Sequence, residues 1–353
     1  MHDHQDRPAI YTPELVERIL LAYGLAAGAD VEVLAMPQGF GMALARVRSG
    51  GRDLVVKQLG PEQSDEWTGF ALRYHAHLHA AGVPSPRLYR STTGELRAQV
   101  DAHRFCLLDW CQGERFDPDQ ADAETRRRRR RQMGALLGLV HAAGTPELAE
   151  AAPGSCRRVP GRLFTGLRPA AVGLPWSRGG GLARRAWLHW HERGEFGREL
   201  RGILPVLEAT RRELVASPLA TDPRLADVLP VHGDFHFENV LFMEGRVAGL
   251  LDFDNANIAP RAFDVGSAMA VVCQLREHED DFLAGYEEGS GRPRPDADLL
   301  RACVLVRLVH SLTFQVVAYA RRQVRSPEKA RWWIRRLIRL LRAELAAREV
   351  VGR

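Results

Sequence analysis

The chain has 353 residues, of which 45% are hydrophobic and 26% are charged, and its formal net charge is +5. This length allows a substantial core and favours two lobes, while the mild basic excess permits acidic partners without requiring them. Five scattered cysteines with no CxxC pair argue against a disulfide framework, and the N-terminus carries no apolar signal core. We therefore expect a cytoplasmic protein.

The first 108 residues alternate between helical and strand-like patterns. The spacing of apolar residues predicts helices over 13–23 and 65–81, and strands over 31–36, 43–48, 53–58, 86–91 and 104–110. The glycine and two prolines of GVPSP end the second helix. We expect residues 1–108 to form a small lobe with an N-terminal helix, an antiparallel sheet and one further helix.

The remaining residues, 109–353, are mainly helical in pattern. They predict helices over 122–143, 263–275, 279–288, 296–322 and 327–349, and two more within 187–216. Residues 152–230 form an insertion, whose glycine-, proline- and arginine-rich start predicts a loop or flap. The most apolar stretch, 302–320, is interrupted by three polar residues and predicts a buried helix. The fold class is thus α+β, with a connector near 108–113 between two lobes.

One hairpin stands out in the helical lobe, in the stretch VHGDFHFENVLFMEGRVAGLLDFDNA. Two apolar runs flank Glu244 and Gly245, which suit a tight turn. Antiparallel folding about this turn places Asn239 opposite Leu250 or Leu251, with Asp252 just beyond. Because facing residues lie about 5 Å apart, the amide and the carboxylate can share one small space.

Asp234 enters the same space from the loop before the hairpin. Three oxygen-bearing side chains at the end of an apolar hairpin suit a hard cation, and Mg²⁺ commonly binds one or two protein groups together with substrate phosphates. Asp and Asn also cap turns. A metal site is favoured over turn capping because the three side chains occur together and because Lys57, at the end of a predicted strand, lies upstream of them.

The spacing of this stretch is similar to a known pattern. His232-Gly233-Asp234 with Asn239 resembles the H-x-D-x-x-x-x-N loop of protein-kinase-like enzymes, and 252–254, Asp-Phe-Asp, stands where those carry D-F-G. In this form the stretch resembles the aminoglycoside phosphotransferase superfamily, which includes choline kinases and type II homoserine kinases. The resemblance covers nearly the whole chain and is most specific over 231–266. It implies a bilobal protein-kinase-like fold and phosphate transfer from ATP, with GTP as an alternative.

The resemblance also implies roles for the hairpin residues. Asp234 would orient the acceptor hydroxyl and take its proton, although positioning matters more than basicity in such transfers. Asn239 and Asp252 would hold Mg²⁺ between the terminal phosphates. Asp254 would touch metal-bound water or substrate, or close a salt bridge at the end of the hairpin.

In the smaller lobe the resemblance implies nucleotide binding. Lys57 would contact the α- and β-phosphates, and its expected helix partner is Glu66, although Glu62 and Asp65 lie close in sequence. The loop QGFGM, with Gly39 and Gly41, would bring backbone amides to the phosphates.

The connector CLLDWCQGE would pair its backbone with the adenine edge at Asp109, Trp110 and Cys111. Asp264 is expected to be structural, as a helix N-cap or a buried acceptor. His232 is expected to shape the catalytic loop, and the role of His236 is open.

The arginine run 126–131 invites a nucleic-acid interpretation. Pairs of Asp122 with Arg126 and of Glu124 with Arg128, four residues apart, favour a solvated helix face instead. No aromatic interleaving or zinc spacing supports nucleic-acid binding.

Three functions compete. The leading hypothesis is an O-phosphotransferase acting on a small hydroxylated molecule, with an antibiotic such as an aminoglycoside favoured by resemblance alone over homoserine- or choline-like metabolites. A Ser/Thr protein kinase would need a longer segment after Asp-Phe-Asp to position a peptide. An inactive nucleotide-binding scaffold is opposed by the retention of Lys57, Asp234, Asn239 and Asp252. The oligomeric state is left open.

Overall fold

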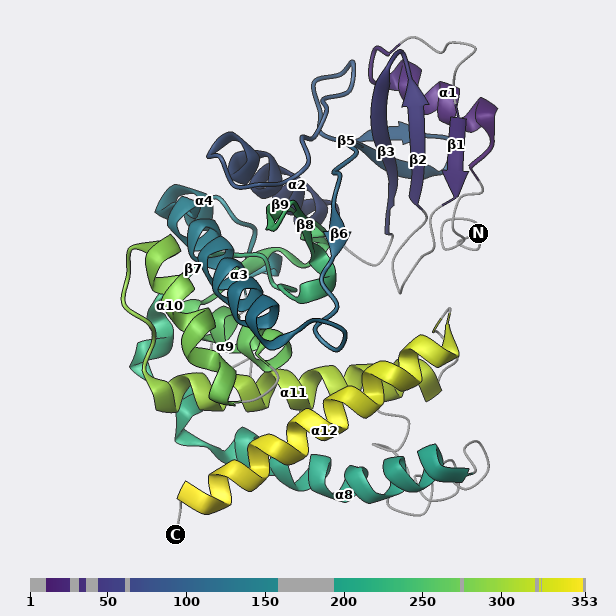
Figure 1. Ribbon diagram of the computed structural model, residues 1–353. Coiled ribbons are helices and arrows are strands. Elements are labelled where there is room, and N and C mark those ends of the chain that lie inside the picture. The colour runs from purple at the N-terminus through teal and green to yellow at the C-terminus, as the bar shows by residue number, and fades with distance from the viewer. Residues whose placement is uncertain are drawn as a thin grey trace. The chain divides into compact units, whose positions relative to one another are not determined.

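The computed structural model describes residues 11–25, 32–35, 44–60, 64–157, 194–273, 276–320, 324 and 326–351. These residues form two compact units, drawn in Figure 1. The sheet unit contains the described residues up to Arg157 together with Pro230–Ile258 and Gly285–Gly291. The helical unit contains the rest. The chain passes between the units several times, so the division into lobes at residue 108 stays a prediction.

An antiparallel five-stranded sheet opens the sheet unit, with strand order β1-β2-β3-β5-β4 (Figure 1). Its strands are β1 Glu32–Ala35, β2 Leu44–Ser49, β3 Arg52–Leu59, β4 Ala98–Val100 and β5 His103–Asp109. Burial alternates along β2 and β3, as expected for strands with one face on a core. That face packs against helix α1, Pro13–Ala22, which Thr12 caps and whose Val16, Ile19 and Leu20 are buried.

Helix α2, Asp65–Ala80, follows β3 and is capped by the Ser64 side chain. The connector after β5 leads into a three-stranded sheet of order β6-β8-β9. These strands are β6 Glu114–Arg115, β8 Val240–Met243 and β9 Arg246–Leu250. Glu244 and Gly245 both have positive φ, 48° and 80°, which a two-residue hairpin turn of this kind requires. The predicted hairpin and its turn are therefore confirmed.

Helix α3, Ala123–Ala143, packs against the last turns of α10, Glu279–Ser290. A Cβ atom at Gly285 or Gly289 would lie 2.0 Å from a backbone oxygen of α3, so only glycine permits this contact. The sheet unit also contains α4 Pro146–Glu150 and short 3₁₀ turns η1 Gly154–Cys156, η4 Phe237–Asn239 and η5 Phe253–Asn255. The chain crosses between the units within β7 Val228–Val231 and β10 Asn257–Pro260.

The helical unit is built on long helices. They are α8 Gly194–Ala216, α9 Arg261–Val272, α11 Ala297–Ala320 and α12 Pro327–Val351, with 3₁₀ turns η2 Pro218–Thr221, η3 Pro223–Ala226 and η6 Arg276–His278. Helix α11 is long and apolar enough to cross a membrane, but 67% of its most apolar window is buried among its neighbours, as in a core helix. The α+β class, with an antiparallel sheet followed by a mainly helical part, is confirmed.

Some expected details are wrong. Residues 86–91 give only a single bridge, from Leu88 to Leu108, and strand β4 was not expected. One helix, α8, spans the described part of 187–216. Helix α3 begins at Ala123 because Asp122 caps it; the acid–base pair that forms is Glu124 with Arg127.

Arg130, in the middle of the arginine run, is 3% exposed and not part of a solvated face. Its neighbours Arg127 and Arg131 are more than half exposed, as expected. The run therefore contributes one side chain to the interior of the sheet unit.

Candidate active site

The loop between β7 and η4 is shaped by Gly233 and His232. Gly233 has φ +77°, and a Cβ atom there would lie 2.2 Å from the carbonyl oxygen of Asn255. The buried His232 donates from Nε2 to the Leu251 carbonyl at 2.9 Å and accepts from the Asp234 amide at Nδ1, at 3.3 Å. His232 thus joins the loop to the second strand of the hairpin, as expected of a loop-shaping residue.

Asn239 lies where the hairpin pattern predicts. Its carbonyl accepts from the Leu251 amide at 2.8 Å, so Asn239 faces Leu251 across the hairpin. Its side-chain nitrogen donates to the Asp234 carbonyl at 3.0 Å, and the residue is 8% exposed. This bond fixes the amide so that Oδ1 is the atom available to a cation.

The Asp234 carboxylate is 26% exposed, and its Oδ2 lies 3.7 Å from His236 Nε2. His236 caps η4 by accepting from the Glu238 amide at Nδ1. The neutral ring that accepts at Nδ1 carries its proton on Nε2, on the side that faces Asp234. His236 is therefore placed to orient the Asp234 carboxylate.

Asp252 adopts a left-handed conformation, with φ 64° and ψ 69°. This conformation costs a non-glycine residue roughly 1–2 kcal/mol, so the surroundings must hold it. The next side chain, Phe253, is buried and stacks on His75 of α2, with ring centroids 4.1 Å apart and planes 14° apart. The Phe253 ring also lies near the His232 ring, with the two ring centroids 4.8 Å apart.

Trp67 of α2 provides a second contact, because its indole Nε1 donates to the Asp254 carbonyl at 3.1 Å. Helix α2 therefore holds the Asp-Phe-Asp segment through Trp67 and His75, about two turns apart. Sequence reasoning missed both residues. A tryptophan and a histidine on a helix carry no signal that separates core packing from support of a site.

Lys57 lies within β3, two residues before its last residue, Leu59, and not at the strand end as expected, and its ammonium lies between two carboxylates. Its Nζ donates to Asp252 Oδ1 at 2.9 Å and to Asp254 Oδ1 at 2.7 Å, and its side chain is 17% exposed. Burial opposes the charged form, but the two carboxylates, Asp252 first, raise the pKa of Lys57 above its ordinary value. The ammonium in turn lowers the pKa of Asp252 against the opposing effect of burial. Lys57 is one of two lysines among 49 basic residues.

The expected pair of Lys57 with Glu66 does not form. Glu66 instead accepts from Ser155 Oγ at 3.4 Å. Asp65, the alternative partner, contacts Arg97 and Arg104. Lys57 instead pairs with the two hairpin carboxylates, and Asp254 thereby forms the salt bridge that was one of its expected roles. Gly39 and Gly41 lie outside the described residues.

Two backbone amides of the connector donate hydrogen bonds within the sheet unit. The Asp109 amide donates to the Arg87 carbonyl and the Trp110 amide to the Asp53 carbonyl, at 3.0 and 2.8 Å. The third expected residue, Cys111, packs its sulfur against Gly249. These bonds occupy the amides of Asp109 and Trp110, so of the three expected residues Cys111 is the one whose amide could donate to a base.

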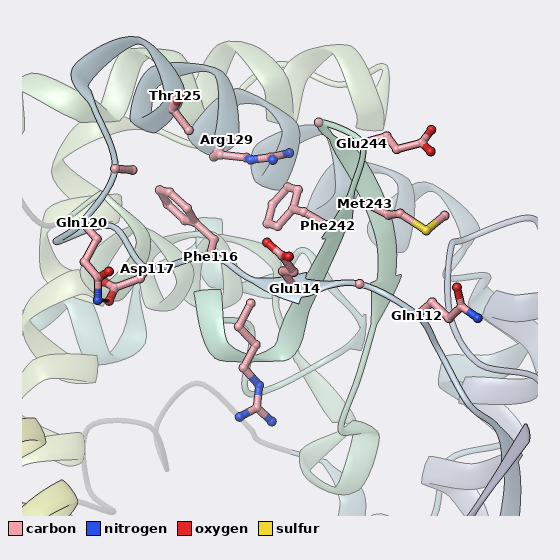
Figure 2. Close-up of a pocket in the computed structure, with 14 residues that line it drawn as sticks. Gln112, Glu114, Phe116, Asp117, Gln120, Thr125, Arg129, Phe242, Met243 and Glu244 are labelled. Carbon is pink, nitrogen blue, oxygen red and sulfur yellow. Dashed lines mark hydrogen bonds between the residues drawn. The ribbon is translucent and has the colours of Figure 1, made fainter. Parts of the chain in front are cut away.

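A cavity of about 630 Å³ lies elsewhere in the sheet unit, between β6, the start of α3 and the hairpin turn (Figure 2). Arg129 reaches across it to lie 4.1 Å above the Phe242 ring, and Phe116 packs edge-on against that ring. None of the expected site residues lines it. It is therefore distinct from the candidate active site.

The donor set fits a magnesium–nucleotide complex. Asn239 and Asp252 offer an amide and a carboxylate oxygen, which Mg²⁺ prefers. The described residues contain no group of three or more His, Cys, Asp or Glu suited to a metal ion. A cation at this hairpin would then take its remaining ligands from phosphates and water. The lysine, the loop aspartate and this donor pair are the groups that a kinase-like phosphotransferase uses.

Comparison with known protein families and structures supports this class of enzyme. The model of the phosphotransferase enzyme family, APH, matches residues 36–302. Since this match spans well over half of the chain, the protein belongs to that family and is a small-molecule phosphotransferase with an alcohol group as acceptor.

Three known proteins illustrate the likeness. A homoserine kinase from Phenylobacterium zucineum is 32% identical over 156 residues, which are 40% of this chain and 45% of that protein. The crystal structure of spectinomycin phosphotransferase, APH(9)-Ia, with ADP and spectinomycin has a TM-score of 0.67 at 13% identity, covering 95% of this chain and 98% of that one. A microcompartment-associated aminopropanol kinase has a TM-score of 0.59 at 17% identity, with 95% and 98% covered.

Proposed function

We propose that the protein transfers the γ-phosphate of ATP to the hydroxyl of a small amino alcohol, with Mg²⁺ as cofactor. One observation carries the proposal: Lys57, Asp234, Asn239 and Asp252 all lie in the sheet unit, joined through the hairpin by direct contacts. Their chemistry is that of phosphoryl transfer, in which positioning and electrostatic stabilisation do most of the work.

Each residue has one task in this proposal. Lys57 contacts the nucleotide phosphates, and the Cys111 backbone pairs with the base. Asp234 orients the acceptor hydroxyl and receives its proton as the bond to phosphorus forms. Asn239 and Asp252 hold Mg²⁺, which neutralises charge on the terminal phosphates when bound.

The acceptor class follows from what the similar proteins share. Homoserine, aminopropanol and spectinomycin each carry a hydroxyl and an amino group, and kinases named for these three molecules resemble this chain in sequence or fold. We therefore propose an amino alcohol, with the antibiotics favoured by the family resemblance as one arm of the test. The sequence likeness to a homoserine kinase favours a small metabolite as the first candidate.

A protein substrate is disfavoured by the short path after the metal hairpin. Only β10 separates η5 from α9, so the chain has no segment there on which to lay out a peptide. All five cysteines are free, which is compatible with the cytoplasm that we propose as the site of action.

The test is a screen with ATP, Mg²⁺ and a panel of homoserine, aminopropanol, choline, spectinomycin and aminoglycosides, followed by mass detection of a monophosphorylated product. We expect one class of amino alcohol to be phosphorylated, and the Asp234→Ala variant to make no product. Phosphorylation of none of them by a folded, nucleotide-binding protein would contradict the proposed acceptor class.

A further inference from the structure

The charges at the hairpin end are balanced within the chain. Asp252 and Asp254 contribute two carboxylates, and the ammonium of Lys57 lies between them at 2.9 and 2.7 Å. The cluster carries less negative charge with the lysine in place than without it. A divalent cation is attracted far more strongly to the second arrangement, and it is repelled by an ammonium a few ångströms away.

The two carboxylates are held in place by groups other than the lysine. The Phe253 ring between them is buried against His75, and the Asp254 carbonyl accepts from the Trp67 indole. Asp252 is kept in a left-handed conformation that it would leave if unsupported. The carboxylates therefore stay in position when the lysine moves, and the flexible lysine stem is the part that can give way.

We propose that Lys57 is the resident counter-cation of Asp252 and Asp254, and that a divalent cation gains these carboxylates only when nucleotide phosphates draw the ammonium away. This inference rests on the proposed function. In this proposal the Lys57 side chain couples metal binding to nucleotide binding. Asp254 has the role of pairing with the lysine ammonium until nucleotide phosphates bind it.

A lysine that only bound phosphates would affect nucleotide binding alone, whereas a counter-cation also affects metal binding. Removal of the Lys57 charge weakens nucleotide binding and, at the same time, strengthens binding of the metal alone. The uncharged side chain of Lys57→Met leaves two carboxylates without a counter-ion, and a divalent cation then supplies the missing charge.

The experiment measures Mn²⁺ binding, by the loss of the free-ion electron paramagnetic resonance signal, with and without a non-hydrolysable ATP analogue. Wild type should bind Mn²⁺ tightly only with the analogue. Without nucleotide, Lys57→Met should bind Mn²⁺ at least about tenfold more tightly than wild type, within the usual range for coupled sites. Lys57→Arg keeps the charge and should keep nucleotide-free Mn²⁺ binding as weak as in wild type.

The chain offers a matched control, since Lys329 is its only other lysine and lies in the helical unit. Lys329→Met removes the same charge and should leave Mn²⁺ binding unchanged. A second readout is the unfolding temperature, which Mn²⁺ alone should raise for Lys57→Met and not for wild type. If Lys57→Met is insoluble, Lys57→Gln is measured in its place.

The outcomes separate the two proposals. Equal nucleotide-free Mn²⁺ affinity for wild type and the uncharged variants overturns the counter-cation role and leaves the proposed function standing. Tight nucleotide-free Mn²⁺ binding by wild type overturns it as well. Failure of wild type to bind Mn²⁺ even with the ATP analogue overturns the proposed function itself.

Discussion

The buried His75 should make the protein lose stability in mild acid. Burial, and secondarily the charge of Lys57, lowers the pKa of His75 to about 3 from the ordinary 6.5. A histidine whose pKa is depressed on folding contributes stability that is complete above pH 6.5 and is lost as pH falls toward the folded value. Between pH 6.5 and pH 5 the loss amounts to about 2 kcal/mol, at roughly 1.4 kcal/mol per pH unit.

The perturbation is His75→Phe, which keeps a planar ring on Phe253 and removes the titration. His75 Nε2 is buried and has no hydrogen-bond partner among the described residues, so the change should cost little at pH 7. Urea unfolding at pH 7 and pH 5 should show that the variant avoids about 2 kcal/mol of the acid loss. His79→Gln, which removes an exposed histidine from the same helix, is the control. Parallel pH dependence in wild type and His75→Phe would refute the reasoning.

Three further substitutions test the site. Asp234→Ala should retain nucleotide affinity in a titration with an ATP analogue while kcat falls by at least about 100-fold, and an unchanged kcat would reject its role. Trp67→Phe removes the donor to the Asp254 carbonyl and should weaken Mn²⁺ binding in the presence of nucleotide about fivefold, as expected for one hydrogen bond; no change would mean that the bond does not position the carboxylate. Glu66→Gln should leave KM for ATP within about twofold of wild type, because Glu66 contacts Ser155 and not Lys57; a tenfold rise would restore the predicted pair.

Local rules in the sequence were sufficient for the hairpin. Alternating apolar runs about Glu244 and Gly245 fix the turn and the register, and the register alone brings Asn239 opposite Leu251. The motif spacing predicts roles for the aspartates on either side, and those roles stay predictions.

The turn and the register could be predicted from local sequence. These inferences succeed because they depend on a few adjacent residues whose geometry is nearly invariant.

The partner of Lys57 depends on contacts that local rules do not reach. Lys57 and Asp252 are 195 residues apart, and which acid meets the lysine is decided by the packing of α2 against the hairpin. Glu66 lies in the first turn of α2 and meets Ser155, while Trp67 and His75 face the Asp-Phe-Asp segment. Nothing in the pattern of α2 distinguishes these faces.

Arg130 illustrates the same limit. Six consecutive arginines predict a solvated surface, yet a helix presents successive residues 100° apart, and one of the six must point inward. Its burial follows from the packing of α3 and not from its own charge.

The most direct test of the central claim is Mg²⁺-dependent transfer of labelled γ-phosphate from ATP to the amino-alcohol panel, compared between wild type and Asp252→Asn. The account predicts labelled product from wild type with Mg²⁺ only, and a loss of at least about 100-fold in Asp252→Asn. Equal transfer by the variant, or transfer by wild type without any divalent cation, would contradict it.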